Sequence, residues 1–141
     1  MSNFDEKTVE RIKKLEREVE RLRVKESPGA WLDWTPTVTW SGTAPTTTTI
    51  TQARYCRVGK LVAFNVYLII TRGSGTSNSL TITPPVAIGS VGVAIGRTTL
   101  HGSLEPIVCY ISSSSNNISP QLITAMSSDG YIIITGLYEA A

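Results

Sequence analysis

Chemically reactive side chains are scarce in this chain of 141 residues. It has one histidine, His101, and the carboxylates beyond residue 30 are Asp33, Glu105, Asp129 and Glu139. A glycosidase needs two carboxyl groups about 5–9.5 Å apart across its cleft, and no spacing in this set predicts such a pair. Three copies of His101 on a threefold axis would form a metal site, but a lone histidine is more often a structural residue. We therefore expect a protein without catalytic activity, metal or cofactor.

Serine and cysteine offer no better nucleophile. The chain is rich in serine but lacks the Gly-x-Ser-x-Gly turn that exposes a catalytic serine in hydrolases. Cys56 and Cys109 are isolated in apolar contexts and do not form a Cys-x-x-Cys pair. We expect two buried free thiols, with a disulfide between them as the less favoured alternative. The absence of a cysteine framework suits a protein that folds in a reducing cytoplasm.

The charged side chains are concentrated near the N-terminus. Residues 1–26 carry 8 of the 13 basic and 7 of the 11 acidic side chains, which leaves 5 and 4 for the rest of the chain. A nucleic-acid-binding domain needs a basic stripe, and these five are scattered. No apolar stretch approaches the ~20 residues that span a bilayer, and the polar N-terminus lacks the apolar core of a secretory signal. We expect no nucleic-acid partner, no membrane insertion and no export signal.

The elements that would position these residues begin with a heptad repeat. Ile12, Leu15, Val19 and Leu22 recur at alternating spacings of three and four, which places them at positions a, d, a and d of a left-handed coiled coil. A helix of this length is marginal in water by itself. The spacing therefore predicts a stalk that is stable only when it associates with other copies.

Charges beside this stripe predict how the copies would align. Arg11 and Glu18 fall at position g, while Glu16 and Arg23 fall at position e. In a parallel, in-register assembly, Arg11 would meet Glu16 and Glu18 would meet Arg23 of the next chain, so both pairs are opposite in sign. Each exposed pair contributes only about 0.3–0.5 kcal/mol. The pairs therefore select register and orientation more than they stabilise the coil.

The number of strands in the coil is indicated by residues 11–16. β-Branched residues at a with Leu at d suit a dimer, yet the sequence Arg-Ile-Lys-Lys-Leu-Glu resembles a short trimerising motif of coiled coils. We expect a homotrimer; the alternative is an amphipathic helix lying on its own domain. Pro28 cannot continue a helix, so the expected organisation is a stalk over residues 1–26, a linker over 27–30 and a head over 31–141.

The head has the sequence pattern of an all-β domain. Short Val/Ile/Thr/Tyr runs alternate with Gly, Pro, Ser and Asn clusters, which predicts antiparallel strands joined by turns. Val58-Gly59-Lys60 predicts a tight turn, and Asp129-Gly130 predicts a hairpin. We expect a jelly-roll-like β-sandwich built from eight strands, near residues 37–41, 53–58, 61–71, 79–83, 91–101, 105–112, 120–126 and 131–138.

Two of these strands have unusual faces. In the 61–71 strand, one face is wholly apolar from Val62 to Ile70 and predicts the core; the other is also largely apolar, which fits a subunit contact or a covering loop. In the 91–96 segment, the larger apolar residues alternate with glycine and alanine. That bare face predicts a close approach by another stretch of backbone.

Aromatic and turn positions of residues 31–85 resemble the C-terminal head domains of bacteriophage tail-fibre and receptor-binding proteins. The likeness rests on Trp31-x-x-Trp34-x-Pro36, Trp40, Ala53-Arg54-Tyr55, Val58-Gly59-Lys60-Leu61-Val62, Tyr67 and Leu80-Thr81-Ile82 before Pro84. The resemblance implies a homotrimeric head on a coiled-coil stalk that attaches a virion to a bacterial surface glycan. It also implies that the stalk joins the rest of a tail or baseplate, and that the chain folds in the host cytoplasm.

Candidate ligand-binding residues lie in two Ser/Asn/Asp-rich segments, each next to a tyrosine. Aromatic rings stack on sugars, while amides, carboxylates and hydroxyls pair with sugar hydroxyls; such runs are also ordinary solvated turns. The candidates are Tyr110, Asn116, Asn117, Asp129 and Tyr131. For Trp31, Trp34 and Trp40 we expect packing beneath the head rather than sugar binding.

Two other classes share this plan of stalk and head. One is a secreted trimeric ligand of the tumour-necrosis-factor or C1q type, which binds a protein receptor; the lack of a signal sequence and of disulfide features disfavours it. The other is a structural cap that ends a fibre and aligns its three chains. Glycan binding distinguishes the attachment head from both alternatives.

Overall fold

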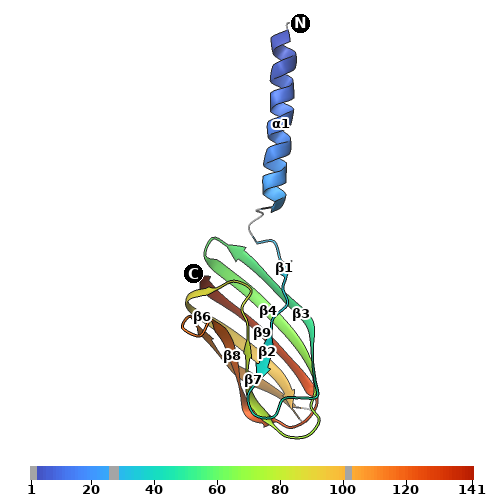
Figure 1. Ribbon diagram of the computed structural model, residues 1–141, viewed down its shortest axis with the longest axis vertical. Coiled ribbons are helices and arrows are strands. Elements are labelled where there is room, and N and C mark those ends of the chain that lie inside the picture. Colours follow the sequence, from blue (N-terminus) through green and yellow to red (C-terminus); the bar gives the residue numbers. More distant parts are fainter. Residues whose placement is uncertain (1–2, 26–28, 101–102) are drawn as a thin grey trace. The chain divides into compact units, whose positions relative to one another are not determined.

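The computed structural model describes residues 3–25, 29–100 and 103–141. The chain divides into two compact units, residues 1–30 and residues 31–141 (Figure 1). The first contains one helix and the second contains the β-strands.

Helix α1 (Asn3–Lys25) occupies the segment that carries the heptad. Asp5 and Glu6 lie in its first turn, where negative charge complements the helix dipole. Ile12, Leu15 and Val19 are 50%, 64% and 51% exposed. Leu22 belongs to the helix, but its side chain lies outside the described residues, as do Glu26, Ser27 and Pro28 of the predicted stop. The predicted helix is confirmed, and its association with other copies remains a prediction.

Nine strands make up the second unit. They are β1 (Leu32–Asp33), β2 (Val38–Trp40), β3 (Thr47–Val58), β4 (Leu61–Thr71), β5 (Ser77–Ile82), β6 (Ile88–Leu100), β7 (Ser103–Ser112), β8 (Asn117–Met126) and β9 (Gly130–Ala140). All eight predicted strands are confirmed, although most boundaries differ by a few residues and β3 begins six residues early. The two-residue strand β1 is too short to leave a hydrophobic period and was not predicted.

The strands form one antiparallel sheet with the order β1-β3-β4-β9-β6-β7-β8-β5-β2. Its two outermost strands are separated by only residues 34–37 in the chain, so the sheet must curl into a half-barrel. Within this link, Trp34 N donates to Ala53 O on β3 (3.1 Å), while Thr83 N, just after β5, donates to Thr37 O (3.1 Å). A mainly β, antiparallel head is confirmed. The two separate sheets of a jelly-roll-like sandwich are not seen among the described strands, so that finer prediction is not confirmed.

Turn predictions had mixed outcomes. Gly59 and Lys60 form the predicted tight turn between β3 and β4, and Gly59 has a φ of 60°. The hairpin predicted at Asp129-Gly130 is wrong, because β8 pairs with β5 and β7 whereas β9 pairs with β4 and β6. Asp129 Oδ1 instead accepts a hydrogen bond from Arg72 N (2.6 Å). Gly130 is required by close packing, since a Cβ there would collide with Thr99 O.

Arg72 ties together the loops at this end of the sheet. Its side chain is 1% exposed and donates hydrogen bonds to the carbonyl oxygens of Thr43, Ser74 and Gly75 and to Ser77 Oγ. Carbonyl dipoles thus compensate a buried cation that would otherwise be costly. The loops after β2 and β4 are held as one piece.

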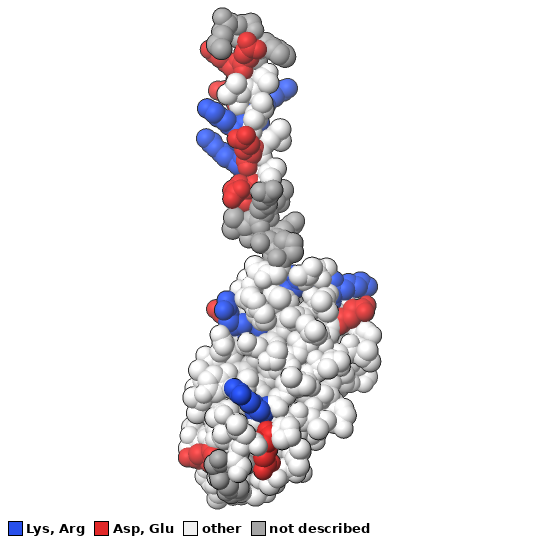
Figure 2. Space-filling model, turned by 180° about the vertical axis from the view of Figure 1, so that it is seen from behind, with Lys and Arg blue, Asp and Glu red and all other residues white. Residues whose placement is uncertain are grey.

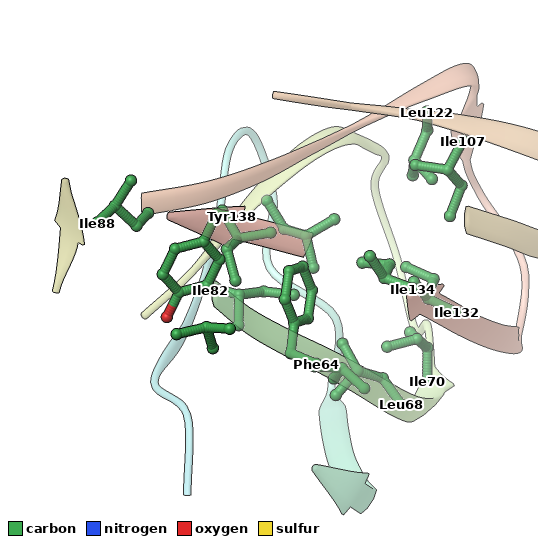
Figure 3. Close-up of a cluster of buried hydrophobic side chains, with 14 of the residues drawn as sticks. Phe64, Leu68, Ile70, Ile82, Ile88, Ile107, Leu122, Ile132, Ile134 and Tyr138 are labelled. Carbon is green, nitrogen blue, oxygen red and sulfur yellow. The ribbon is translucent and has the colours of Figure 1, made fainter. Parts of the chain in front are cut away.

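The inner face of the curled sheet is the hydrophobic core. Val62, Phe64, Val66, Leu68 and Ile70 of β4 are at most 1% exposed, so the predicted core face is confirmed. The cluster in Figure 3 shows side chains from several strands converging on this interior, including Phe64 and Tyr138, whose ring centroids are 6.0 Å apart. Burial of large apolar side chains is worth about 1.5–3 kcal/mol each.

The middle of strand β6 carries its large apolar side chains on the outer side of the sheet and its small residues on the inner side. Val91, Val93 and Ile95 point outward and are 82%, 72% and 73% exposed, whereas the glycines and alanine between them point inward. A Cβ on Gly92 would lie 2.5 Å from Leu137 O, so β9 approaches too closely for a larger residue. The predicted close approach of backbone is confirmed, and it explains why the large side chains of β6 face outward.

Candidate ligand-binding cleft

A cleft of about 750 Å³ lies where residues 33–35 run beside β3. It falls within the range of about 300–1,000 Å³ that is usual for small-molecule sites. Its walls come from the link between β1 and β2, from the middle of β3, and from Tyr67 on β4. All of these residues belong to the second unit.

The shape of this cleft depends on a β-bulge in β3. The register with β4 shifts between Ile50 and Gln52, so Thr51 has no partner opposite it. A bulge bends its strand and re-aims the residues that follow. Beyond the bulge, Gln52 pairs with Tyr67, and both line the cleft.

Arg54 and Asp33 supply opposite charges to the cleft. Arg54 Nε lies 3.3 Å from Asp33 Oδ1, and their side chains are 40% and 88% exposed. An exposed pair of this kind adds at most about 1 kcal/mol to stability. Arg54 Nη2 also donates to Trp31 O (3.3 Å), but Nε is buried and makes no well-aligned hydrogen bond with any described residue. The guanidinium is therefore held in place with hydrogen-bonding capacity left over.

Two aromatic side chains in the walls are fixed by their own contacts. The Trp34 indole donates from Nε1 to Thr83 O (3.2 Å) and meets Phe64 edge-on at 6.4 Å between centroids. Tyr67 is packed edge-on against Tyr131, at 6.0 Å. Both are half-buried, so each offers part of a rigid ring to the cleft.

The chemistry of the cleft suits a neutral, hydroxyl-rich ligand. Aromatic surface lies beside a carboxylate that accepts hydrogen bonds, a guanidinium that donates them, and the Gln52 amide, which does both. The charges of Arg54 and Asp33 cancel, so nothing selects a strongly charged molecule. Among the described residues, no three His, Cys, Asp or Glu side chains come together as metal ligands.

The five residues predicted to bind a ligand do not form one site. Tyr110, Asn116 and Asn117 lie at the end of β8 where the chain arrives from β7, and Asp129 and Tyr131 lie beyond its opposite end. Asn116 adopts a φ of 52° and its Oδ1 accepts a hydrogen bond from Ile88 N (2.9 Å). Asn116 and Asp129 are thus acceptors for backbone amides.

Two of the five, Tyr110 and Tyr131, could still take part in binding, one through its exposed ring and the other through contact with the cleft. Tyr110 is 61% exposed on β7, and Tyr131 supports Tyr67 from behind the cleft wall. His101 lies outside the described residues.

The three tryptophans have different surroundings. Packing of Trp34 and Trp40 against the core is confirmed, and Trp40 Nε1 also donates to Thr48 Oγ1 (2.9 Å). Trp31 is 43% exposed, so the packing predicted for it is wrong. Trp34 combines core packing with a place in the cleft wall.

Both thiols are free, as expected, but both cysteines are only partly buried, so the predicted full burial is wrong. Cys56 is paired with Ala63 on the outer side of the sheet, whereas Cys109 is packed against the core. Burial raises the pKa of the Cys109 thiol to about 12, although a hydrogen bond with the Ser119 backbone opposes this shift. Cys109 is therefore protonated and unreactive near neutral pH.

Comparisons with known proteins add no further assignment. No protein-family model matches the chain, and neither a curated protein nor a solved structure shows significant similarity to it. Within the described part of the chain, no helix is long and apolar enough to cross a membrane. The features of the molecule that bear on function are the geometry of the cleft and the exposed apolar side chains.

Proposed function

We propose that this chain is a trimeric, non-catalytic attachment head of the bacteriophage tail-fibre type, which binds a glycan on the host bacterial surface. The observation that carries the proposal is the cleft, where rigid aromatic surface lies beside charge-compensated donors and acceptors. Sugars present both apolar ring faces and hydroxyl groups, so this combination matches their chemistry. Shallow sites of this kind bind weakly one at a time, and three joined copies bind far more tightly.

The helix supports the trimeric part of the proposal. Its stripe of Ile12, Leu15 and Val19 is at least half exposed, and burial in a parallel three-stranded coiled coil would remove that surface from water. The finer architecture follows the same proposal. The half of the curled sheet containing β3, β4 and β9 and the half containing β7, β8 and β5 would act as the two layers of a jelly-roll-like sandwich.

The biological setting proposed for this molecule is a virion. The N-terminal stalk would join the rest of a tail or baseplate, and the chain would fold in the cytoplasm of the host bacterium before assembly. Two free cysteines are compatible with such a reducing compartment.

Binding of the full chain to an array of bacterial surface glycans tests the function. We expect binding by the native chain and its loss in Arg54→Ala, since the guanidinium loses its donors. Arg57→Ala is the matched control, because Arg57 lies on the same strand outside the cleft and its side chain donates a hydrogen bond to the Gly59 carbonyl. Equal glycan binding by both variants would show that the cleft is not the glycan-binding site. Adhesion of the native chain to host cells without any glycan binding would favour a protein receptor.

A further inference from the structure

A continuous apolar surface covers the outer side of the sheet around β6. We call it the apolar face and define it by six large side chains that are between 47% and 82% exposed: Val91, Val93, Ile95, Val108, Tyr110 and Leu137. At 25 cal/mol per Å², full burial of one such side chain corresponds to roughly 60–120 Å². Because the six side chains are on average about two-thirds exposed, the apolar face offers roughly 230–460 Å², which is comparable with the largest patch on a typical monomer.

The register shows that four of these side chains lie in two directly opposite pairs. Val93 lies opposite Leu137 on β9, and Ile95 lies opposite Val108 on β7. Arg97 brings a charge to the edge of this surface, between Ile133 and Pro106 on the adjacent strands. The face of the head drawn in Figure 2 is mostly uncharged, with a few small groups of basic and acidic side chains.

Packing inside the head does not account for these residues. Between Gly92 and Gly96, the inner side of β6 is restricted to glycine and alanine by the approach of β9, where a Cβ on Gly136 would lie 2.6 Å from Ala94 Cβ. The backbone of β6 accepts any residue type at its outward positions. Polar side chains there would not reduce the apolar area buried in the core. The large apolar side chains therefore serve a contact outside the chain.

The occupant of the apolar face is indicated by the other exposed apolar surface, on α1. Parallel association of the heptad would bring the first residues of several heads together, since residues 27–30 span at most about 14 Å. A short tether of this kind sets an effective concentration on the order of millimolar. At that concentration another copy of the head outcompetes a dilute partner for an uncharged apolar surface. The exposed apolar area approaches the non-polar share, just over half, of the ~800 Å² per partner that a standard interface buries.

We infer that the apolar face of β6, β7 and β9 is the contact between heads of neighbouring copies of this chain. This inference rests on the self-association part of the proposed function. Strands β3 and β4, which carry the cleft, are separated from β6 by β9. Contact between heads and ligand binding in the cleft therefore use different parts of the outer surface.

Hydroxyl-radical footprinting of the full chain tests the inference. We expect Val93, Ile95 and Tyr110 to be oxidised several-fold more slowly in the native chain than in Ile12→Asn/Leu15→Asn at high dilution. A native particle whose mass by light scattering exceeds one chain of 15.3 kDa, but whose apolar face is oxidised at the same rate in both proteins, overturns the inference while self-association stands. A native mass of one chain overturns both.

A second comparison keeps the test independent of the stalk. Val93→Glu/Ile95→Glu should abolish the protection of Tyr110 in a chain whose circular dichroism is unchanged. Thr47→Glu/Thr49→Glu is the matched control, because both threonines are exposed on strand β3, which is separated from the apolar face by β4. The inference fails if Tyr110 stays protected in the first pair or loses protection in the second.

Discussion

Strands β4 and β6 are similarly apolar in sequence, yet they are built in opposite ways. The large side chains of β4 that point inward, such as Phe64, are completely buried, whereas Val93 and Ile95 of β6 point outward and are more than 70% exposed. The difference arises from the close approach of β9, because between Gly92 and Gly96 the inner side of β6 has no space for more than glycine or alanine. Apolar residues on a strand therefore do not by themselves identify its core side; the space left by the neighbouring strands decides.

This contrast separates two roles for apolar surface in one sheet. Inward side chains determine the stability of the single head, and outward ones determine what the head can contact. Substitutions that act on only one of these properties test whether the separation holds.

The largest effect is expected from the centre of the inner face. Phe64→Ala should reduce the free energy of unfolding by about 3–5 kcal/mol, because it leaves a cavity among fully buried neighbours. Urea denaturation measures the change. Ile69→Ala is the control on the outer side of the same strand, at 44% exposure, and equal losses in the two variants would contradict the contrast between the faces.

A smaller loss is expected where the inner face is tightest. Gly136→Ala places a methyl group within 2.6 Å of Ala94 Cβ and 2.7 Å of Phe64 Cζ, and overpacking of this kind costs about 1–3 kcal/mol. Adding Ala94→Gly should recover part of the loss, because it removes one of the two contacts. Thermal unfolding of the single and double variants would show this, and a fully tolerated Gly136→Ala would mean that the inner face is not tightly packed where β9 meets Ala94.

Tyr138 tests a polar contact on the inner face. Its hydroxyl donates to Val86 O (2.6 Å) and accepts from Val86 N (3.2 Å), so Tyr138→Phe should cost about 1–3 kcal/mol through the unpaired backbone groups. Burial raises the Tyr138 pKa above its ordinary value of 10.0, so the neutral hydroxyl is favoured by folding.

The pH dependence of this variant follows from the sign of that shift. The unfolded chain releases the proton first, so the contribution is complete below pH 10.0 and is lost as the pH rises beyond it. The difference in unfolding free energy between the native chain and Tyr138→Phe should therefore narrow in alkaline solution. A difference that does not change between neutral and alkaline pH would contradict the assignment.

The mildest test compares one cysteine on each face. Near neutral pH, iodoacetamide should label Cys56 and leave Cys109 unmodified, because only the thiolate reacts and the pKa of Cys109 is about 12. Mass spectrometry of Cys56→Ser and Cys109→Ser after labelling identifies the modified residue. Labelling of Cys109 in the folded chain would show that this part of the inner face opens to solvent.

The sequence predicted the elements of this molecule better than their connections. Alternation located the core face of β4 and the bare face of β6, because side-chain period and residue size are local properties. The hairpin prediction at Asp129-Gly130 failed because turn residues do not reveal whether the strands on either side pair with each other. Here the Asp129 carboxylate accepts a hydrogen bond from the backbone amide of Arg72, 57 residues away in sequence.

The cleft was missed for a similar reason. It depends on a register shift at Thr51 and on the approach of residues 33–35 to β3, and neither leaves a composition signal. The alternation of Gln52 and Arg54 with the buried Ala53 was the available hint that two polar side chains share one outward face. Serine and asparagine runs drew attention instead to Asn116 and Asp129, whose side chains serve the backbone.

The smallest strand has a mechanical consequence. A pull applied to the head through the chain before Trp31 loads β1 first, and only Leu32 and Asp33 pair with β3 there. Beyond them, the tension reaches the Trp34 ring, which is anchored among Tyr55 and Phe64. Strand β1 would therefore peel away before the core yields, and with it would go Asp33, one wall of the cleft. The lifetime of a bound ligand would then depend on the tension in the chain.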